Sequence, residues 1–132
     1  MQIVRRLKAK SSVNPGPVSH RETLQQQRAA HAAALHAEAT RLAAAAAALG
    51  AHRVILFGSL ARDDIALTSD LDLLIVWDSP LDIVSRTVDL YRRLGPRQAV
   101  DLLVYTPEEM LAMADRPFVR RILHEGKVLY EA

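Results

Sequence analysis

Hydrophobic and polar positions change their spacing several times along this chain of 132 residues. From Arg21 to Leu49 there is no Gly or Pro and alanine dominates, which predicts one long helix ending before Gly50. Leucines seven residues apart, with an alanine between each pair, form a narrow apolar seam on this helix. We expect the seam to pack against the sheet of the same domain; docking to a partner helix is the alternative. The seam residues are Ala32, Leu35, Ala39, Leu42, Ala46 and Leu49.

Short apolar runs after this helix predict strands. They cover residues 53–57, 71–77 and 98–105, and a last short strand is expected over 127–130. Helices between strands produce an α+β domain, close to α/β, with a small mixed β-sheet flanked by helices.

Helix signals lie between these runs. Ser79 and Pro80 resemble an N-cap and first-turn pair, which predicts a helix running to Leu94. Thr106 and Glu109 have the spacing of a capping box. Asp115 is the expected cap of a last helix over residues 117–124.

Composition limits the class of protein. The length suits one domain. We predict a basic, flexible tail over residues 1–20, with four Lys or Arg and no acid, and a single folded domain over 21–132. The chain has no Cys, which excludes thiolate chemistry and fits a cytoplasmic protein. No apolar run approaches the length of a membrane span, so no membrane contact is expected.

Two carboxylates mark the second predicted strand. Asp70 and Asp72 are two residues apart, so both project from one face together with Leu74 and Val76. Oxygen-rich sites of this kind suit Mg²⁺, which usually keeps water and substrate phosphates among its ligands.

The third predicted strand adds another acid. Asp101 lies in an otherwise apolar strand, on the face opposite to Val100 and Leu102. A charge there is costly unless it is paired or bound to a metal. If this strand lies beside the second, Asp101 completes the cluster, holds a cation and accepts a proton from an attacking hydroxyl.

A turn between the first predicted strand and a short helix supplies a candidate phosphate-binding site that complements the acids. Gly58 lets the backbone approach a ligand closely, and amides at a helix start favour phosphate. The Ser59 hydroxyl adds a donor, and Arg62, one turn on, can reach the same anion.

Other polar residues give weaker signals. The histidines lack metal-ligand spacing: His31 and His36 are five residues apart, and solvated helix positions explain them better. Ser59 has no evident His–Asp partnership, which argues against a serine hydrolase. Trp77 and Tyr91 are expected in the core.

These motifs resemble the minimal nucleotidyltransferase (MNT) family of the polymerase-β-like nucleotidyltransferase superfamily. The shared pattern is Gly-Ser, then Ala-Arg, then Ser-Asp-x-Asp, then an Asp in a later strand. Asp63 departs from it, because many members have Gly after the Arg. The likeness covers roughly residues 35–130. The matching positions here are Gly58, Ser59, Ala61, Arg62, Ser69, Asp70, Asp72 and Asp101.

The resemblance implies a substrate and cofactors. Members use ATP or another nucleoside triphosphate with two Mg²⁺ ions and transfer a nucleoside monophosphate to a hydroxyl. Asp70, Asp72 and Asp101 would then be the catalytic metal ligands. Gly58, Ser59, Arg62 and Ser69 would bind the nucleotide.

The resemblance also implies a partner. Many small members resemble antitoxins that adenylylate a Tyr of a HEPN-domain toxin, an all-helical RNase. The chain has no room for the extra substrate domain of aminoglycoside-modifying relatives, which favours a protein acceptor. The alternatives are a non-catalytic toxin-binding module and a small-molecule nucleotidyltransferase acting as an oligomer. A nucleic-acid acceptor is disfavoured, since only the basic tail suggests one.

Overall fold

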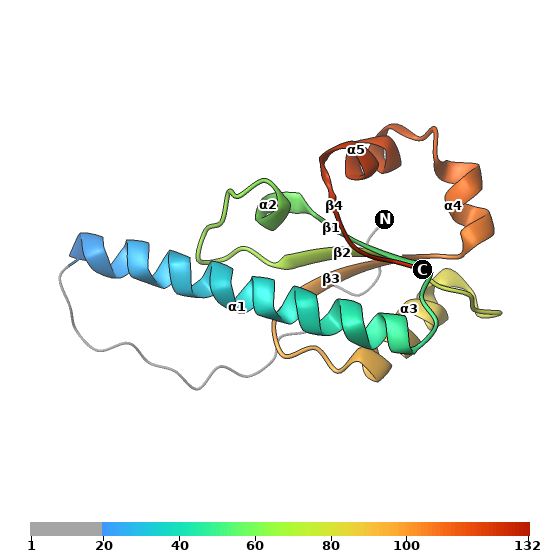
Figure 1. The fold of residues 1–132 in the computed structure, drawn as a ribbon, viewed down its shortest axis with the longest axis horizontal. Helices are drawn as coiled ribbons and strands as arrows, with labels where there is room; N and C mark the ends of the chain where they lie inside the picture. The colour runs from blue at the N-terminus through green and yellow to red at the C-terminus, as the bar shows by residue number, and fades with distance from the viewer. Residues whose placement is uncertain (1–19) are drawn as a thin grey trace.

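A computed structural model describes residues 20–132 of the chain. The predicted basic tail therefore lies outside the described residues, except for its last residue, which begins α1. The elements in chain order are α1 (His20–Ala48), β1 (Arg53–Phe57), α2 (Gly58–Ala61), β2 (Leu71–Val76), α3 (Ile83–Leu94), β3 (Val100–Tyr105), α4 (Pro107–Met113), α5 (Pro117–Glu125) and β4 (Lys127–Glu131) (Figure 1).

The four strands form one mixed sheet in the order β3-β2-β1-β4. β1 runs antiparallel to β2 and β4, whereas β2 and β3 are parallel. β2 and β3 therefore begin at the same end of the sheet. β1 finishes at that end, with Phe57 paired with Asp72. This architecture confirms the expected α+β class with a small mixed sheet.

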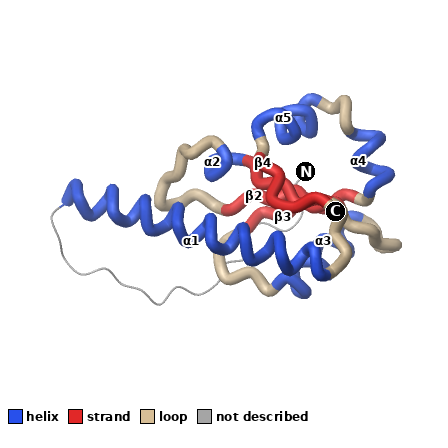
Figure 2. The backbone as a smooth tube through the Cα atoms, in the orientation of Figure 1, coloured by secondary structure: helices blue, strands red, loops and turns tan. Residues whose placement is uncertain are grey.

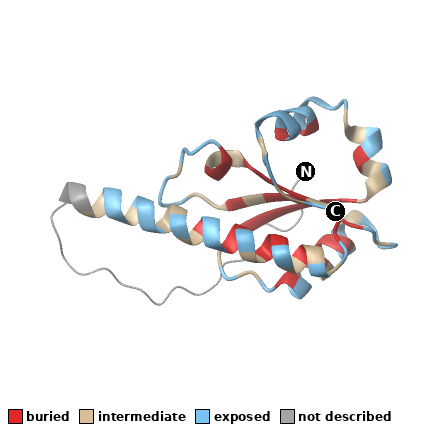
Figure 3. Ribbon diagram, in the orientation of Figure 1, coloured by how far each residue is buried: buried red, intermediate tan, exposed pale blue. Residues whose placement is uncertain are grey.

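Helices cover both faces of the sheet (Figure 2). On one face, α1 and α3 pack through residues such as Leu35, Leu42 and Leu90, which are fully buried. On the other, α4 and α5 contribute Met110 and Ile122 to a second apolar cluster. Figure 3 shows α1 with a buried side toward the sheet and an exposed side away from it. The apolar seam thus packs on the domain's own sheet, as predicted.

Two predicted core aromatics lie where expected. Trp77 is buried in the α1-side cluster, and its indole N–H donates to the Leu49 carbonyl at 3.0 Å. Tyr91 packs against the same cluster. Within the described residues, no helix has the length and apolar character needed to cross a membrane.

Helix capping confirms one prediction and corrects two. Thr106 and Glu109 form the predicted capping box of α4. α3 begins later than predicted, because Asp82 accepts from the Ser85 N–H and is the N-cap, whereas the Ser79 hydroxyl accepts from the Leu81 N–H within a turn. The predictions based on Ser79 and Pro80 were therefore wrong.

The capping prediction for α5 was also wrong. Its N-cap is Arg116, which makes no side-chain capping bond, followed by Pro117 in the first turn. The Arg116 N–H donates to the Met113 carbonyl at 2.9 Å. Asp115 thus lies in the turn that closes α4 rather than at the start of α5.

The third strand begins two residues later than predicted because a buried acid of α1 captures the preceding amides. Glu38 accepts from the backbone N–H groups of Arg97 and Gln98, the latter at 3.1 Å. Arg41 donates to Glu38 at 2.7 Å and to the Gly95 carbonyl at 2.9 Å. Burial raises the pKa of Glu38, but these hydrogen bonds outweigh it and the pKa falls below its usual range.

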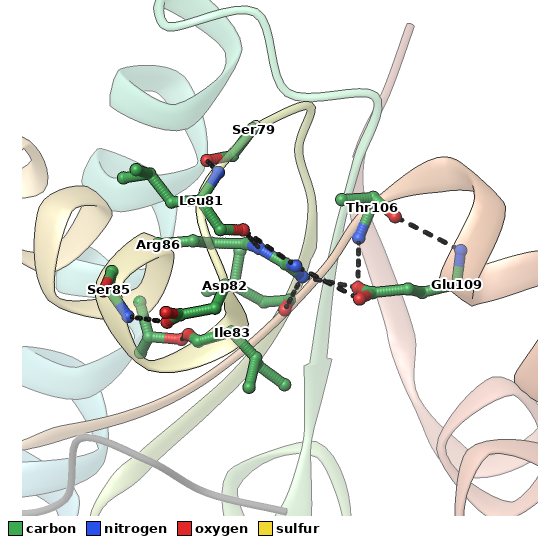
Figure 4. Close-up of polar contacts among 10 residues, drawn as sticks. Ser79, Leu81, Asp82, Ile83, Ser85, Arg86, Thr106 and Glu109 are labelled. Carbon is green, nitrogen blue, oxygen red and sulfur yellow. Dashed lines mark hydrogen bonds and ion pairs between the residues drawn. The ribbon is translucent and has the colours of Figure 1, made fainter.

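A buried arginine joins α3, β3 and α4 (Figure 4). Arg86 is 4% exposed and donates to the Val104 carbonyl at 3.1 Å. It also donates to both carboxylate oxygens of Glu109, the capping-box residue of α4. The hydrogen bond from Arg86 holds the pKa of Glu109 below its usual range. This ion pair fixes α4 against the end of the sheet opposite α2.

Gly126 separates α5 from β4. A Cβ atom there would lie 2.4 Å from the Ile122 carbonyl oxygen and 2.6 Å from Cγ2 of Ile55. Real Cβ contacts are longer than this, so the absence of a side chain allows the end of α5 to lie directly on β1.

Candidate active site

The acids of two strands lie side by side at the end of the sheet where β2 and β3 begin. Asp72 and Asp101 are register partners across the parallel pair. Both lie on the α5-side face, together with Leu74 and Leu103 of the second cluster. Asp101 is only 4% exposed, whereas Asp72 is half-buried. The two side chains therefore lie on one face of the sheet, as the alternation of side chains along the strands predicts.

Electrostatics shows that all three acids interact. Burial raises the pKa of Asp72 to about 7, and the neighbouring charges of Asp101 and Asp70 add to this effect. Arg62 acts in the opposite direction, and protonated Asp72 donates a hydrogen bond to Asp101. Asp70 lies just before β2 and is likewise half-buried. The structure thus brings together the three predicted acids and one predicted cation.

Gly58 lies against this cluster. Its φ is +74°, and a Cβ atom there would lie 2.1 Å from Oδ2 of Asp72. Any side chain at this position would displace the carboxylate. Gly58 begins α2, and Ser59 follows it half-buried, so the turn predicted to bind phosphate lies beside the acids.

The Ser69–Asp70 segment is held from two sides. The Ser69 hydroxyl accepts from the Ala66 N–H at 2.9 Å, which closes the turn before β2. His31 of α1 contacts the Ser69 carbonyl through Nε2 at 2.8 Å. The prediction that His31 is merely solvated was therefore wrong, since it links α1 to the segment that carries Asp70. The 38 residues between these partners hid this contact from sequence reasoning.

Asp63 has a backbone conformation that few residues other than glycine adopt. Its φ is +58°, in the left-handed region that favours glycine. Asp tolerates this conformation better than most residues. The loop after Arg62 therefore adopts a glycine-type turn without a glycine.

A cavity of about 520 Å³ opens over Asp72. Its lining includes the predicted residues Gly58 and Arg62, and α5 supplies a further wall. Sequence reasoning missed the α5 wall, although its residues follow the three- and four-residue spacing of one helix face. The α5 residues that line the cavity are Phe118, Arg121, Ile122 and Glu125.

The acidic cluster suits a divalent cation bound together with a substrate. Two adjacent carboxylates, one of them with its pKa raised to about 7 by burial and by its neighbours, are an arrangement that a dication stabilises in ionised form. Among the described residues, no group of three or more His, Cys, Asp or Glu side chains is arranged so that it could hold a metal ion by itself. Mg²⁺ commonly takes its remaining ligands from water and substrate phosphates. The assignment of Asp70, Asp72 and Asp101 as metal ligands stays a prediction that this chemistry fits.

Comparison with known proteins decides the family. Residues 49–132 match the family described as "Polymerase beta, Nucleotidyltransferase". The chain belongs to this family. The matched nucleotidyltransferase segment includes β1 to β4, and so every acid of the cluster and the whole cavity wall.

One relative agrees with this assignment in sequence, and one solved structure shares the fold. The chain is 39% identical over 80 residues to a protein of Methanocaldococcus jannaschii named "Putative protein adenylyltransferase". The aligned part covers 59% of the chain and 77% of that relative. The chain also resembles the crystal structure of "a putative nucleotidyltransferase" from Sulfolobus solfataricus, with a TM-score of 0.56 and 19% identity, over 87% of this chain and 93% of that one. At this identity the structural likeness supports the fold alone.

Proposed function

We propose that the chain is a Mg²⁺-dependent protein adenylyltransferase of the MNT type, which transfers AMP from ATP to a hydroxyl of a partner protein. The observation that carries this proposal is the convergence of Asp72 and Asp101, register partners on one face, opposite Gly58 and Arg62. The protein adenylyltransferase name of the M. jannaschii relative supports a protein as the acceptor.

In this proposal each side chain has a defined task. Asp70, Asp72 and Asp101 would hold two Mg²⁺ ions, whose contribution would be to neutralise charge on the triphosphate. The backbone at Gly58 and the side chain of Arg62 bind phosphate oxygens and balance developing negative charge.

The reaction is a displacement at phosphorus. The acceptor hydroxyl oxygen forms a bond to the α-phosphorus of ATP, and the bond from that phosphorus to the bridging oxygen breaks. Asp101 takes the hydroxyl proton, and pyrophosphate leaves. The products are AMP-modified protein and pyrophosphate, so atoms and charge balance.

The proposed acceptor is a Tyr of a HEPN-type toxin, which makes the chain an antitoxin. The test combines purified chain, Mg²⁺, ATP labelled at the α-phosphate and the protein encoded beside it. Label should appear on that protein, and Asp101→Asn should lower the rate by about 100-fold or more. Asp64→Asn is the matched control, because this acid lies exposed in the loop between α2 and β2.

Two results would contradict the proposal. Label transfer that survives the combined Asp70→Ala and Asp72→Ala changes would exclude the metal-ligand role. Neutralisation of the toxin by Asp101→Asn as efficiently as by the unmodified chain would favour a binding module over catalysis.

A further inference from the structure

Helix α5 lines the cavity with three exposed side chains that the proposed chemistry does not use, Phe118, Arg121 and Glu125, and the first two offer complementary contacts to a ligand. Phe118 is 43% exposed although it is a large apolar residue, and Arg121 is also exposed. Both line the cavity that contains Asp72. An apolar ring and a cation on α5, in the same cavity lining as Arg62 and Gly58, suit a ligand with an aromatic part and an anionic part.

Phe118 packs against a residue that is paired with Asp72 in the sheet. Phe57 is the register partner of Asp72. It belongs to the apolar cluster that Met110 and Ile122 of α4 and α5 also join. The rings of Phe57 and Phe118 meet at an interplanar angle of 88° with centroids 6.3 Å apart. This edge-to-face contact leaves a face of one ring uncovered, and the exposure of Phe118 shows that its ring remains open to the cavity. The ring is therefore adjacent to the acids but separate from them.

Arg121 follows Phe118 by three residues, which places both on one helix face. Arg121 is a charged, exposed side chain in the lining of a cavity that also includes the carboxylates of Asp72 and Glu125. Its guanidinium has the planar donor geometry that matches phosphate oxygens. The cavity volume of about 520 Å³ lies within the usual range of small-ligand sites.

We propose that the cavity wall of α5 is the nucleoside subsite of the donor, in which Phe118 stacks on the base of ATP and Arg121 binds its phosphate chain. This inference rests on the proposed function, because it assumes that a nucleoside triphosphate occupies the cavity. Stacking on a single aromatic ring tolerates every base. The subsite therefore contributes affinity more than base selection.

Matched variants on the same helix test the subsite. The probe is ATP with a methylene bridge between its α- and β-phosphates, bound in the presence of Mg²⁺ and measured by titration calorimetry. Phe118→Ala should raise the dissociation constant about five- to fifty-fold, as loss of one stacking contact predicts. Arg121→Ala should raise it to a similar extent. Leu123→Ala and Arg120→Ala are the controls, because these exposed α5 residues are absent from the cavity wall, and both should stay within about twofold.

A spectroscopic variant gives a second measurement. The chain has a single Trp, which is buried in the core, so Phe118→Trp introduces a distinct exposed fluorophore. Binding of the analogue should quench its fluorescence and retain affinity close to that of the unmodified chain. If Phe118→Ala fails to fold, Phe118→Leu preserves apolar contact with Phe57 while removing the ring, and should show the same loss of affinity.

The possible failures are distinguishable. If the unmodified chain does not bind the analogue, the proposed function itself fails. If it binds and Phe118→Ala or Phe118→Leu binds equally well, only the nucleoside subsite is overturned. Unchanged fluorescence of Phe118→Trp during saturating binding would overturn it in the same way.

Discussion

Gly58 and Asp72 are in direct contact: a single added carbon on the glycine would lie 2.1 Å from a carboxylate oxygen of the aspartate. The backbone of the anion-binding turn therefore lies directly against the proposed metal ligand. Neither element can shift without moving the other. If the proposed function holds, phosphate binding and cation binding would therefore be coupled by packing, with no hydrogen bond between the two elements required.

Gly58→Ala is expected to abolish transfer. The new methyl group would displace Asp72, and the positive φ of +74° adds strain for any other residue. We expect a loss of activity of about 100-fold or more, comparable to loss of a catalytic group. Gly95→Ala is the matched control, because Gly95 also has a positive φ but has nothing within 4 Å of the added carbon. That variant should lose about 1 kcal/mol of stability and keep its activity. Equal activity of the two variants would contradict the packing argument.

Asp72 makes stability depend on pH with a defined sign. Its pKa is about 7 in the folded protein against 3.8 unfolded, so between these values the folded state binds more protons. The free energy of unfolding therefore falls as pH rises through this window. Asp72→Asn removes this dependence. From pH 4 to pH 8, the free energy of unfolding of the variant should therefore rise relative to that of the unmodified chain by about 1–2 kcal/mol, after screening by solvent. Urea unfolding with a chelator present measures this, and parallel pH profiles of the two proteins would refute it.

His31 is expected to position the segment that carries Asp70. His31→Ala removes one hydrogen bond to the Ser69 carbonyl, which corresponds to about a two- to tenfold loss in kcat/KM. His31→Gln retains an N–H donor and should restore part of the rate. His36→Ala is the control, since this histidine is exposed on the same helix. Steady-state kinetics at fixed Mg²⁺ measures the effect, and an unchanged His31→Ala rate would assign the contact to stability alone.

The ion pair of Arg86 and Glu109 is expected to stabilise the fold without acting in catalysis. Glu109→Ala leaves a guanidinium that is 4% exposed without its carboxylate partner and removes the capping box of α4. A loss of about 2–4 kcal/mol follows from these two effects. Glu108→Ala, in the same helical turn but exposed, should cost about 0.5 kcal/mol or less. Thermal unfolding compares the two, and equal melting temperatures would contradict the assignment.

The sequence predicted what depends on local alternation. Asp72 and Asp101 could be placed on one face because strands alternate, and because an isolated acid in an apolar strand requires a partner. The capping box of Thr106 and Glu109 was predictable for the same local reason. Asp82 was missed because the more familiar Ser-Pro pair precedes it by only two residues.

Contacts between distant segments were not predictable in this way. The spacing of Phe118 and Arg121 shows that they share a helix face, but not that this face covers the acids. Whether it covers them depends on how α5 packs against β1 in the folded chain. His31 and Ser69 are joined for a similar reason, by the length and direction of α1.

Gly126 fixes how closely α5 approaches the sheet. With no side chain between Ile122 and Ile55, the C-terminal end of α5 lies directly on β1. Any bulkier residue would press on both partners and separate the helix from the strand. In the proposed subsite, the spacing of its two walls would therefore depend on a position that is absent from the cavity lining.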